Sequence, residues 1–141
     1  MSLKEQSLNE KLRSGEMTLS REAGPLTLFG LFEQEDKPGK WDLIASASWL
    51  KSNRASIQRI VDALQPYFQT AEWGVIRQVV PLHTDEPFVQ AMLRALRPAE
   101  HEVCEIGPLF TADYRIGRAV IITVNPAAVS QGQGREVALS L

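Results

Sequence analysis

Three carboxylates flank the turn of a predicted β-hairpin, and acids at this spacing are typical of metal or proton chemistry. Glu33 and Glu35 follow one apolar segment, and Asp42 begins the next. If the hairpin places all three on one face, they could bind a divalent cation or share a proton. The simpler interpretation is a salt-bridged hairpin end, because Lys37 and Lys40 lie between the acids and would neutralise them.

The hairpin is predicted from two strand-like segments, 25–34 and 40–50, which are separated by the turn pair Pro38-Gly39. Side chains alternate across a strand, so the register decides which residues share a face. A two-residue turn and the longer loop 35–40 predict the same two faces. One is a core face with Leu26, Leu28, Gly30, Phe32, Trp41, Leu43, Ala45, Ala47 and Trp49. The other carries Thr27, Phe29, Leu31, Glu33, Glu35, Asp42, Ile44, Ser46 and Ser48.

The second of these faces has an apolar centre, formed by Phe29, Leu31 and Ile44, and a polar rim. Protein interfaces often have this arrangement. The helices expected from the sequence are too few to cover both faces of a sheet, so a second copy of the chain is a natural cover. We therefore expect a homodimer, or a complex with a protein partner, whose interface includes this surface and buries Phe29 or Ile44.

An aromatic residue and two arginines follow in the segment "DYRIGR", as Tyr114, Arg115 and Arg118. This combination suits an anion or a stacked base. However, the net charge of −2 argues against electrostatic binding of DNA or RNA through an overall basic surface. Nucleic-acid binding through these residues is an open alternative, and a hairpin turn with solvated charges is the favoured interpretation.

The other reactive side chains are scattered along the chain. No G-x-S-x-G motif surrounds Ser46, and nothing in the sequence places His83 or His101 beside it. His83 and Asp85 could ligate a metal, but the chemistry of a helix start explains the same segment. Cys104 has no cation near it in the sequence and is expected to be a small buried hydrophobe. We assign no catalytic residue, no metal ligand and no cofactor.

The composition is that of an ordinary globular protein. Of 141 residues, 44% are hydrophobic and 23% are charged, which excludes disordered and fibrous classes. A single cysteine cannot form an internal disulfide and fits a reducing compartment. No apolar run approaches the roughly 20 residues of a membrane span, and the polar N-terminus lacks the apolar centre of a signal peptide. We therefore expect a cytoplasmic protein without a membrane partner.

Helices must position these residues together with the strands. Apolar periodicity predicts helices at 2–15, 53–65 and 85–97. Ser52 or Asn53 is expected to cap the second, and Thr84 or Asp85 the third. On the third helix Phe88, Met92 and Leu96 are expected to be buried and Arg94 exposed. Strands are expected at 25–34, 40–50, 72–83, 101–110 and 115–125.

The order α-ββαβαββ predicts a single α+β domain with a mixed sheet of about five strands and helices on at least one face. We expect this domain to span 1–125, with a polar, weakly helical leader at 1–22 and a loose tail at 126–141. No complete catalytic set is present, so the leading hypothesis is a small binding or interaction domain that self-associates. The alternatives are a metal-dependent hydrolase or nucleotidyltransferase-like enzyme that uses the three acids, and a nucleic-acid-binding module that uses arginines.

Overall fold

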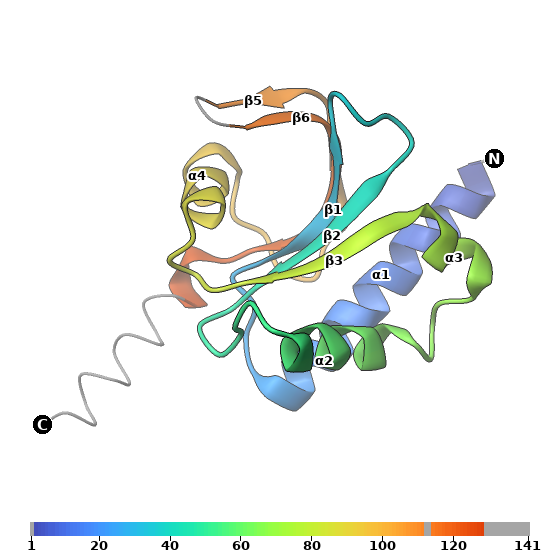
Figure 1. Ribbon diagram of the computed structural model, residues 1–141, viewed down its shortest axis with the longest axis horizontal. Coiled ribbons are helices and arrows are strands. Elements are labelled where there is room, and N and C mark those ends of the chain that lie inside the picture. Colours follow the sequence, from blue (N-terminus) through green and yellow to red (C-terminus); the bar gives the residue numbers. More distant parts are fainter. Residues whose placement is uncertain (1, 112–113, 129–141) are drawn as a thin grey trace, which may run out of the picture.

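The computed structural model describes residues 2–111 and 114–128, with side chains from residue 8 onward. These residues form one α+β domain, in which a six-stranded mixed sheet carries helices on both faces (Figure 1). The predicted fold class is therefore confirmed. Residues 129–141, which make up most of the expected tail, lie outside the described residues.

The sheet is centred on the first hairpin and the last strand. Its strands are β1 Leu28–Gln34, β2 Trp41–Ser46, β3 Ile76–Leu82, β4 Cys104–Ile106, β5 Leu109–Phe110 and β6 Arg115–Val124. Their spatial order is β3-β2-β1-β6-β4, and β5 also pairs with β6. β1 is antiparallel to both of its neighbours, whereas β2 and β3 are parallel. A parallel pair needs a crossover, and the two helices between β2 and β3 provide it.

The N-terminal helix, α1 Ser2–Ala23, is longer than predicted. It continues through Gly15, which faces the second helix and has no side chain to keep the two helices apart. A Cβ atom added there would overlap the side chain of Leu64. Leu12 and Leu19 of α1 are fully buried. The segment expected as a weakly helical leader thus supplies core side chains.

The second helix, α2 Arg54–Leu64, begins where the sequence predicts. The side chain of Asn53 caps it by accepting a hydrogen bond from the backbone N–H of Ser56 at 2.9 Å. This cap satisfies one of the backbone donors that a helix start leaves without a partner.

The strand expected over 72–83 is partly wrong, because its first residues form a short helix, α3 Thr70–Val75. The carboxylate of Glu72 accepts a hydrogen bond from the backbone N–H of Gln69 at 2.6 Å and pairs with Lys11 of α1 at 3.1 Å. The hydrogen bond from Gln69, and secondarily Lys11, hold the pKa of the Glu72 carboxyl below its ordinary value. These local contacts outweigh the strand propensity of this segment.

The helix α4 Pro87–Ala95 begins later than predicted. Its N-cap is Glu86 rather than Thr84 or Asp85, and Pro87 occupies the first turn, where its missing N–H costs nothing. The segment before it forms a turn, closed by a hydrogen bond from the Glu86 N–H to the His83 carbonyl at 3.1 Å.

Burial along α4 follows the prediction only in part. Met92 is buried and Arg94 is exposed, as expected, whereas Phe88 and Leu96 are half-buried. Leu96 follows the end of the helix, so the apolar stripe is shorter than the sequence indicates. The strand expected at 101–110 is also divided, because Gly107 and Pro108 separate β4 from β5.

The hairpin pairs in antiparallel fashion as predicted, but its register is shifted by one residue. Leu31 lies opposite Leu43, and Phe32 lies opposite Asp42. The chain turns through 35–40, where Gly39 adopts a φ of 82°, a conformation that favours glycine. A shift of one residue moves the side chains of one strand to the other face. The predicted grouping of the two faces is therefore wrong.

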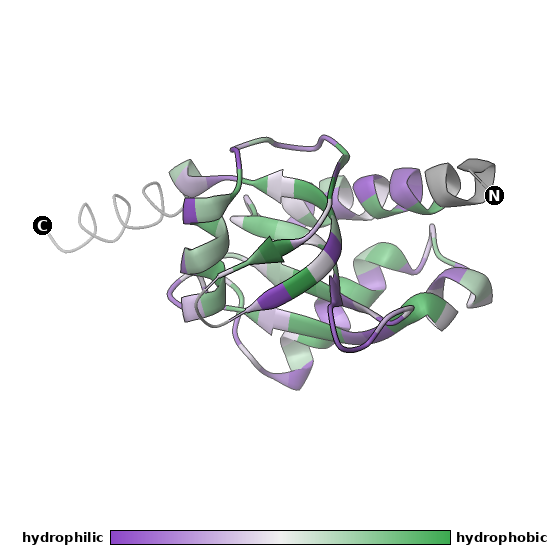
Figure 2. Cartoon of the chain, turned by 90° about the horizontal axis from the view of Figure 1, so that it is seen from above, coloured by the Kyte–Doolittle hydropathy of each residue, from purple (hydrophilic) through white to green (hydrophobic). Residues whose placement is uncertain are grey.

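Helices cover the two faces of the sheet unequally (Figure 1). We call the side under α1, α2 and α3 the first face and the side under α4 the second face. The first-face core includes Phe29, Leu31, Leu43, Ala45, Val120 and Ile122. The second-face core includes Leu28, Phe32, Ile44, Ile116, Ala119 and Ile121. In Figure 2 hydrophobic colours follow these strands, and the connecting loops are mostly hydrophilic.

One edge of the sheet is formed by β3, and the chain blunts it. Pro81 has no N–H to offer a further strand, and its carbonyl accepts a hydrogen bond from the hydroxyl of Ser52 at 3.1 Å. None of the helices within the described residues combines the length and the apolar character needed to cross a bilayer.

Candidate functional site

The three acids of the hairpin do not form one cluster, because each has an arginine of its own. Glu33 lies on the first face, where Arg118 donates two hydrogen bonds to its carboxylate at 2.9 and 3.2 Å. The backbone N–H of Gly39 adds a third at 2.6 Å. These contacts, with the Arg118 hydrogen bond as the largest cause, hold the pKa of the Glu33 carboxyl below its ordinary value.

Asp42 lies on the second face and is buried. Arg77 of β3 binds both of its carboxylate oxygens at 2.9 Å, and Gln34 donates a further hydrogen bond at 3.1 Å. The hydrogen bond to Asp42 raises the pKa of the Arg77 guanidinium above its usual value. Bidentate ion pairs of this kind fix the relative orientation of the two side chains as well as neutralising their charges.

Glu35 pairs with Arg115 at 3.3 Å, and both side chains are exposed. The lysines expected to neutralise the acids, Lys37 and Lys40, are thus replaced in that role by arginines from β3 and β6. Arginine suits these positions because its planar guanidinium binds both oxygens of a carboxylate. Within residues 8–111 and 114–128, no three His, Cys, Asp or Glu side chains are grouped closely enough to hold a metal ion.

The predicted interface residues are buried inside the monomer. Phe29 and Leu31 contribute to the first-face core, and Ile44 contributes to the second. Their relative exposures are 0%, 1% and 7%. The premise that these side chains form an exposed apolar patch is therefore wrong, and self-association of the chain stays a prediction. The shifted register separates these residues, and helices of the same chain cover both positions.

The predicted anion-binding residues divide between the two faces. Arg118 lies over the ring of Trp41 at 5.1 Å on the first-face side. Tyr114 packs edge-on against Phe88 on the second-face side, with ring centroids 4.9 Å apart. Arg115 lies over Phe110, 4.4 Å from the ring centroid.

A cleft of about 300 Å³ opens on the second face beside α4. Strands β1, β2, β3 and β6 form its floor, and Phe88 of α4 forms part of its wall. Its apolar lining consists of Phe32, Ile44, Val80, Leu82, Phe88, Tyr114 and Ile116. Its polar lining consists of Gln34, Asp42, Gln78 and Arg115. The cleft thus brings together Asp42, Tyr114 and Arg115, which the sequence singled out for separate reasons.

The aromatic rings give this cleft a defined wall. Phe88 contacts Phe32 edge-on, with centroids 5.4 Å apart, and it contacts Tyr114 in the same manner. Small-molecule sites usually combine apolar and aromatic walls with a few placed polar groups. Arg115 is the cationic residue of the lining, but its guanidinium pairs with the exposed carboxylate of Glu35 and lies over Phe110, and neither of these residues lines the cleft.

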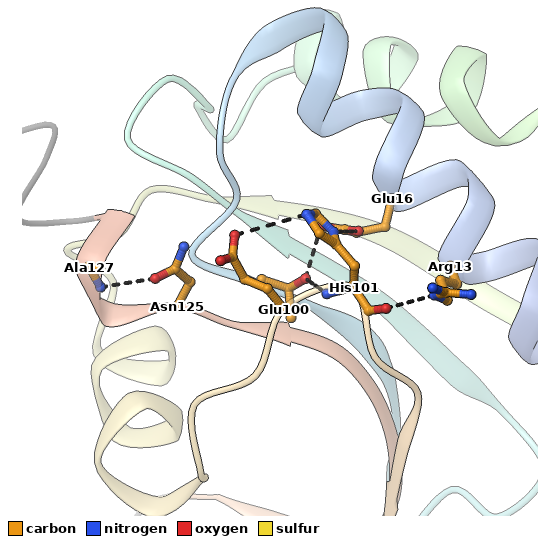
Figure 3. Close-up of polar contacts among 7 residues, drawn as sticks. Arg13, Glu16, Glu100, His101, Asn125 and Ala127 are labelled. Carbon is orange, nitrogen blue, oxygen red and sulfur yellow. Dashed lines mark hydrogen bonds and ion pairs between the residues drawn. The ribbon is translucent and has the colours of Figure 1, made fainter.

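A second polar site lies where α1 meets the end of β6, and sequence reasoning missed it. Glu16 of α1 is completely buried, yet it is an acid. One carboxylate oxygen lies 2.6 Å from Nδ1 of His101, and the other accepts a hydrogen bond from the Thr123 hydroxyl at 2.9 Å. Figure 3 shows Glu16 and His101 facing each other, with Arg13 and Glu100 nearby. Glu16 falls at helical spacing from buried Leu12, and an acid on an apolar stripe was the available signal.

The remaining predicted positions carry no chemistry of their own. The hydroxyl of Ser46 is buried and has no hydrogen-bond partner within the described part of the chain. His83 lies 3.4 Å from Asp85, and both side chains are well exposed. Cys104 is exposed, so its expected burial is wrong. It lies on the short strand β4, which is a sheet edge and is covered less than the centre.

Comparison with known proteins gives no match: no family model, no curated protein and no solved structure resembles the chain closely enough to be reported.

Proposed function

We propose that the protein is a binding domain, and that its ligand is a small molecule with an aromatic or aliphatic body and one acidic group. The observation that carries the proposal is the second-face cleft, with its edge-on aromatic wall and Arg115 in its lining. Its volume of about 300 Å³ is at the lower end of the range for small-molecule sites.

The acidic group of the ligand follows from the charge of Arg115. Its ion pair with Glu35 is exposed and 3.3 Å long, and such pairs contribute about 0–1 kcal/mol. A ligand carboxylate at the mouth of the cleft can exchange with Glu35, because this weak pair releases the guanidinium of Arg115 at little cost. Asp42 is a poor site for a ligand cation, because Arg77 already occupies both of its oxygens.

The other functions considered from the sequence have less support. The three acids are held apart by three arginines, which does not favour a metal-dependent enzyme. The candidate nucleic-acid contacts divide between the two faces of the sheet, with Arg118 on the first and Tyr114 on the second, so they do not form one surface for a nucleic acid. An extended peptide needs a free strand edge or a long groove, and the edge at β3 is blunted by Pro81. We retain a cytoplasmic location in the proposal, because a reducing compartment keeps the exposed Cys104 thiol free.

The test uses a matched pair of small probes, naphthoate and its neutral amide, followed by backbone NMR shifts of the full chain. Saturable shifts at Val80, Phe88 and Ile116, with the acid binding more tightly than the amide, are the expected result. Shifts confined to other surfaces, or no saturation with either probe, would refute the proposal.

Two substitutions separate the parts of the site. Arg115→Gln should weaken binding of the acid by up to about fivefold and leave the amide unchanged, since an exposed ion pair contributes about 0–1 kcal/mol. Val80→Trp should fill the cleft and abolish binding of both probes. Arg59→Gln is the matched control, because Arg59 lies over Trp49 at 5.4 Å just as Arg115 lies over Phe110, but away from the cleft.

A further inference from the structure

His101 is held at its backbone as well as at its ring. Its N–H donates to the Thr123 hydroxyl at 3.2 Å, and its carbonyl accepts a hydrogen bond from Nε of Arg13 at 2.6 Å. Its φ of 55° is in the left-handed region, which non-glycine residues rarely adopt. Such a conformation persists only where the surroundings over-determine it, and it is common at functional sites.

Glu16 determines which ring nitrogen of His101 is available. The buried carboxylate lies 2.6 Å from Nδ1, so an ionised Glu16 accepts the Nδ1 hydrogen and leaves the lone pair on Nε2. The His101 side chain is 34% exposed. Metal-binding histidines nearly always use one nitrogen for the metal and donate the other N–H to a carboxylate, carbonyl or water. The ring is therefore prepared to bind a cation through Nε2.

The neighbour of Nε2 decides between a cation and an anion. A carboxylate oxygen of Glu100 lies 4.0 Å from Nε2, and the Glu100 side chain is half exposed. Arg13 is directed elsewhere, since its Nε serves the His101 carbonyl and its NH1 lies 3.7 Å from Glu10. A phosphate at Nε2 would meet the Glu100 charge, whereas a metal cation would gain a second ligand.

The spacing of the two ligand atoms fits a transition metal. Zinc–nitrogen and zinc–oxygen bonds are each about 2.0–2.2 Å long, so a metal placed between Nε2 and Oε2 spans up to about 4.2 Å. At the observed 4.0 Å the two bonds would lie nearly in line, and a tetrahedral angle needs a separation of about 3.4 Å, which a rotation of the half-exposed Glu100 side chain provides.

We propose that His101 Nε2 and the Glu100 carboxylate bind a divalent transition-metal cation of the Zn²⁺ class, with Glu16 as the buried carboxylate that orients the imidazole. Water molecules complete the coordination of this two-residue site. This site is independent of the second-face cleft, since none of its residues lines that cleft.

The test titrates Zn²⁺ alone into the full chain carrying Cys104→Ser, which removes the exposed thiol as a competing soft ligand. The chain has two histidines, so imidazole nitrogen NMR resolves both. Before addition, His101 should appear as the Nδ1–H tautomer. On addition, the Nε2 signal of His101 should shift to saturation, and that of His83 should not. A shift at His83 alone, or none at either ring in excess Zn²⁺, would overturn the proposal.

Substitutions in the same background test each role by calorimetry. His101→Ala should abolish binding. Glu16→Gln should weaken it about 10–100-fold, the usual loss when the carboxylate behind a metal-binding histidine is removed. Glu100→Gln should weaken it at least about tenfold, and because Glu100 is half exposed this variant keeps the fold even if Glu16→Gln does not.

The matched control is His83→Ala, because the pair His83 and Asp85 is exposed and has no buried carboxylate behind it. Its Zn²⁺ affinity should equal that of the background protein. Unchanged affinity in Glu100→Gln, or a loss in His83→Ala equal to that in His101→Ala, would show that Zn²⁺ binds without the proposed geometry.

Discussion

The two faces of the sheet present similarly apolar strand residues, but helices cover the two faces to different extents. Three helices cover the first face, and its core includes fully buried leucines from α1. The nine-residue helix α4 covers only part of the second face and leaves the cleft beside it. Apolar strand residues are thus used for stability on one side and, in our proposal, partly for binding on the other.

The largest expected effect comes from removing a core leucine under the first face. Leu12→Ala should lower the free energy of unfolding by about 2–5 kcal/mol, since the side chain is fully buried and its loss leaves a cavity. Leu93→Ala on α4 is the matched substitution on the second face, where the side chain is half-buried, and should cost about 1 kcal/mol. Urea unfolding measures both. Equal losses would show that the two faces are packed alike.

The next effect concerns a close approach inside the sheet. Gly30 of β1 points toward the second face, and an added Cβ would lie 2.6 Å from the backbone oxygen of Val120. Gly30→Ala should therefore cost about 1–3 kcal/mol, the usual range for overpacking. If the urea concentration at half-unfolding equals that of the wild type, β1 and β6 can move apart at Gly30 without a cost in stability.

Gly117→Ala is the control for this prediction. A Cβ atom there would meet its nearest neighbour at 3.5 Å, an ordinary contact. The substitution should be neutral or slightly stabilising, because alanine reduces the entropy of the unfolded chain.

A smaller effect is expected at the aromatic wall of the cleft. Phe88→Leu keeps an apolar side chain but removes two edge-on aromatic contacts, with Phe32 and Tyr114. Each such pair contributes about 0.5–1.5 kcal/mol beyond burial, and because Phe88 is half-buried the two together should contribute at the lower end of their sum, roughly 1–2 kcal/mol. Thermal unfolding checks this value, and the same variant should bind naphthoate more weakly. A stable variant with unchanged naphthoate affinity would show that the aromatic rings of the cleft do not contribute to binding.

The sequence was sufficient to predict the fold class. It was not sufficient to predict which strand residues lie on which face of the sheet. Helical spacing and the Asn53 cap identified α2, and apolar alternation identified the hairpin. The turn length was not determined, because Pro38-Gly39 suits several turns and the hydrogen bond from Gly39 to Glu33 is visible only in three dimensions. A shift of one residue then exchanged the faces and scattered the predicted carboxylate cluster.

The candidate sites were less predictable than the elements, for a related reason. Arg77, Arg115 and Arg118 come from other strands than the acids they bind, and strand order cannot be read from periodicity. Glu16 and His101 are separated by most of the chain and meet only because α1 crosses the sheet near the end of β6. Contacts between segments far apart in sequence need the topology first.

The smallest effect is a pH dependence of stability that comes from the first-face acid Glu33. Because Arg118 and Gly39 lower the pKa of the folded Glu33 carboxyl, the unfolded chain binds its proton more readily. This contribution to stability is fully present above the ordinary glutamate pKa of about 4.3 and is lost as the pH falls through the lower folded value. Urea unfolding between about pH 6 and pH 3 should show a shallower decline for Glu33→Gln than for the wild type. If Glu33→Gln declines as the wild type does, the Arg118 pair makes no difference to the energetics of Glu33.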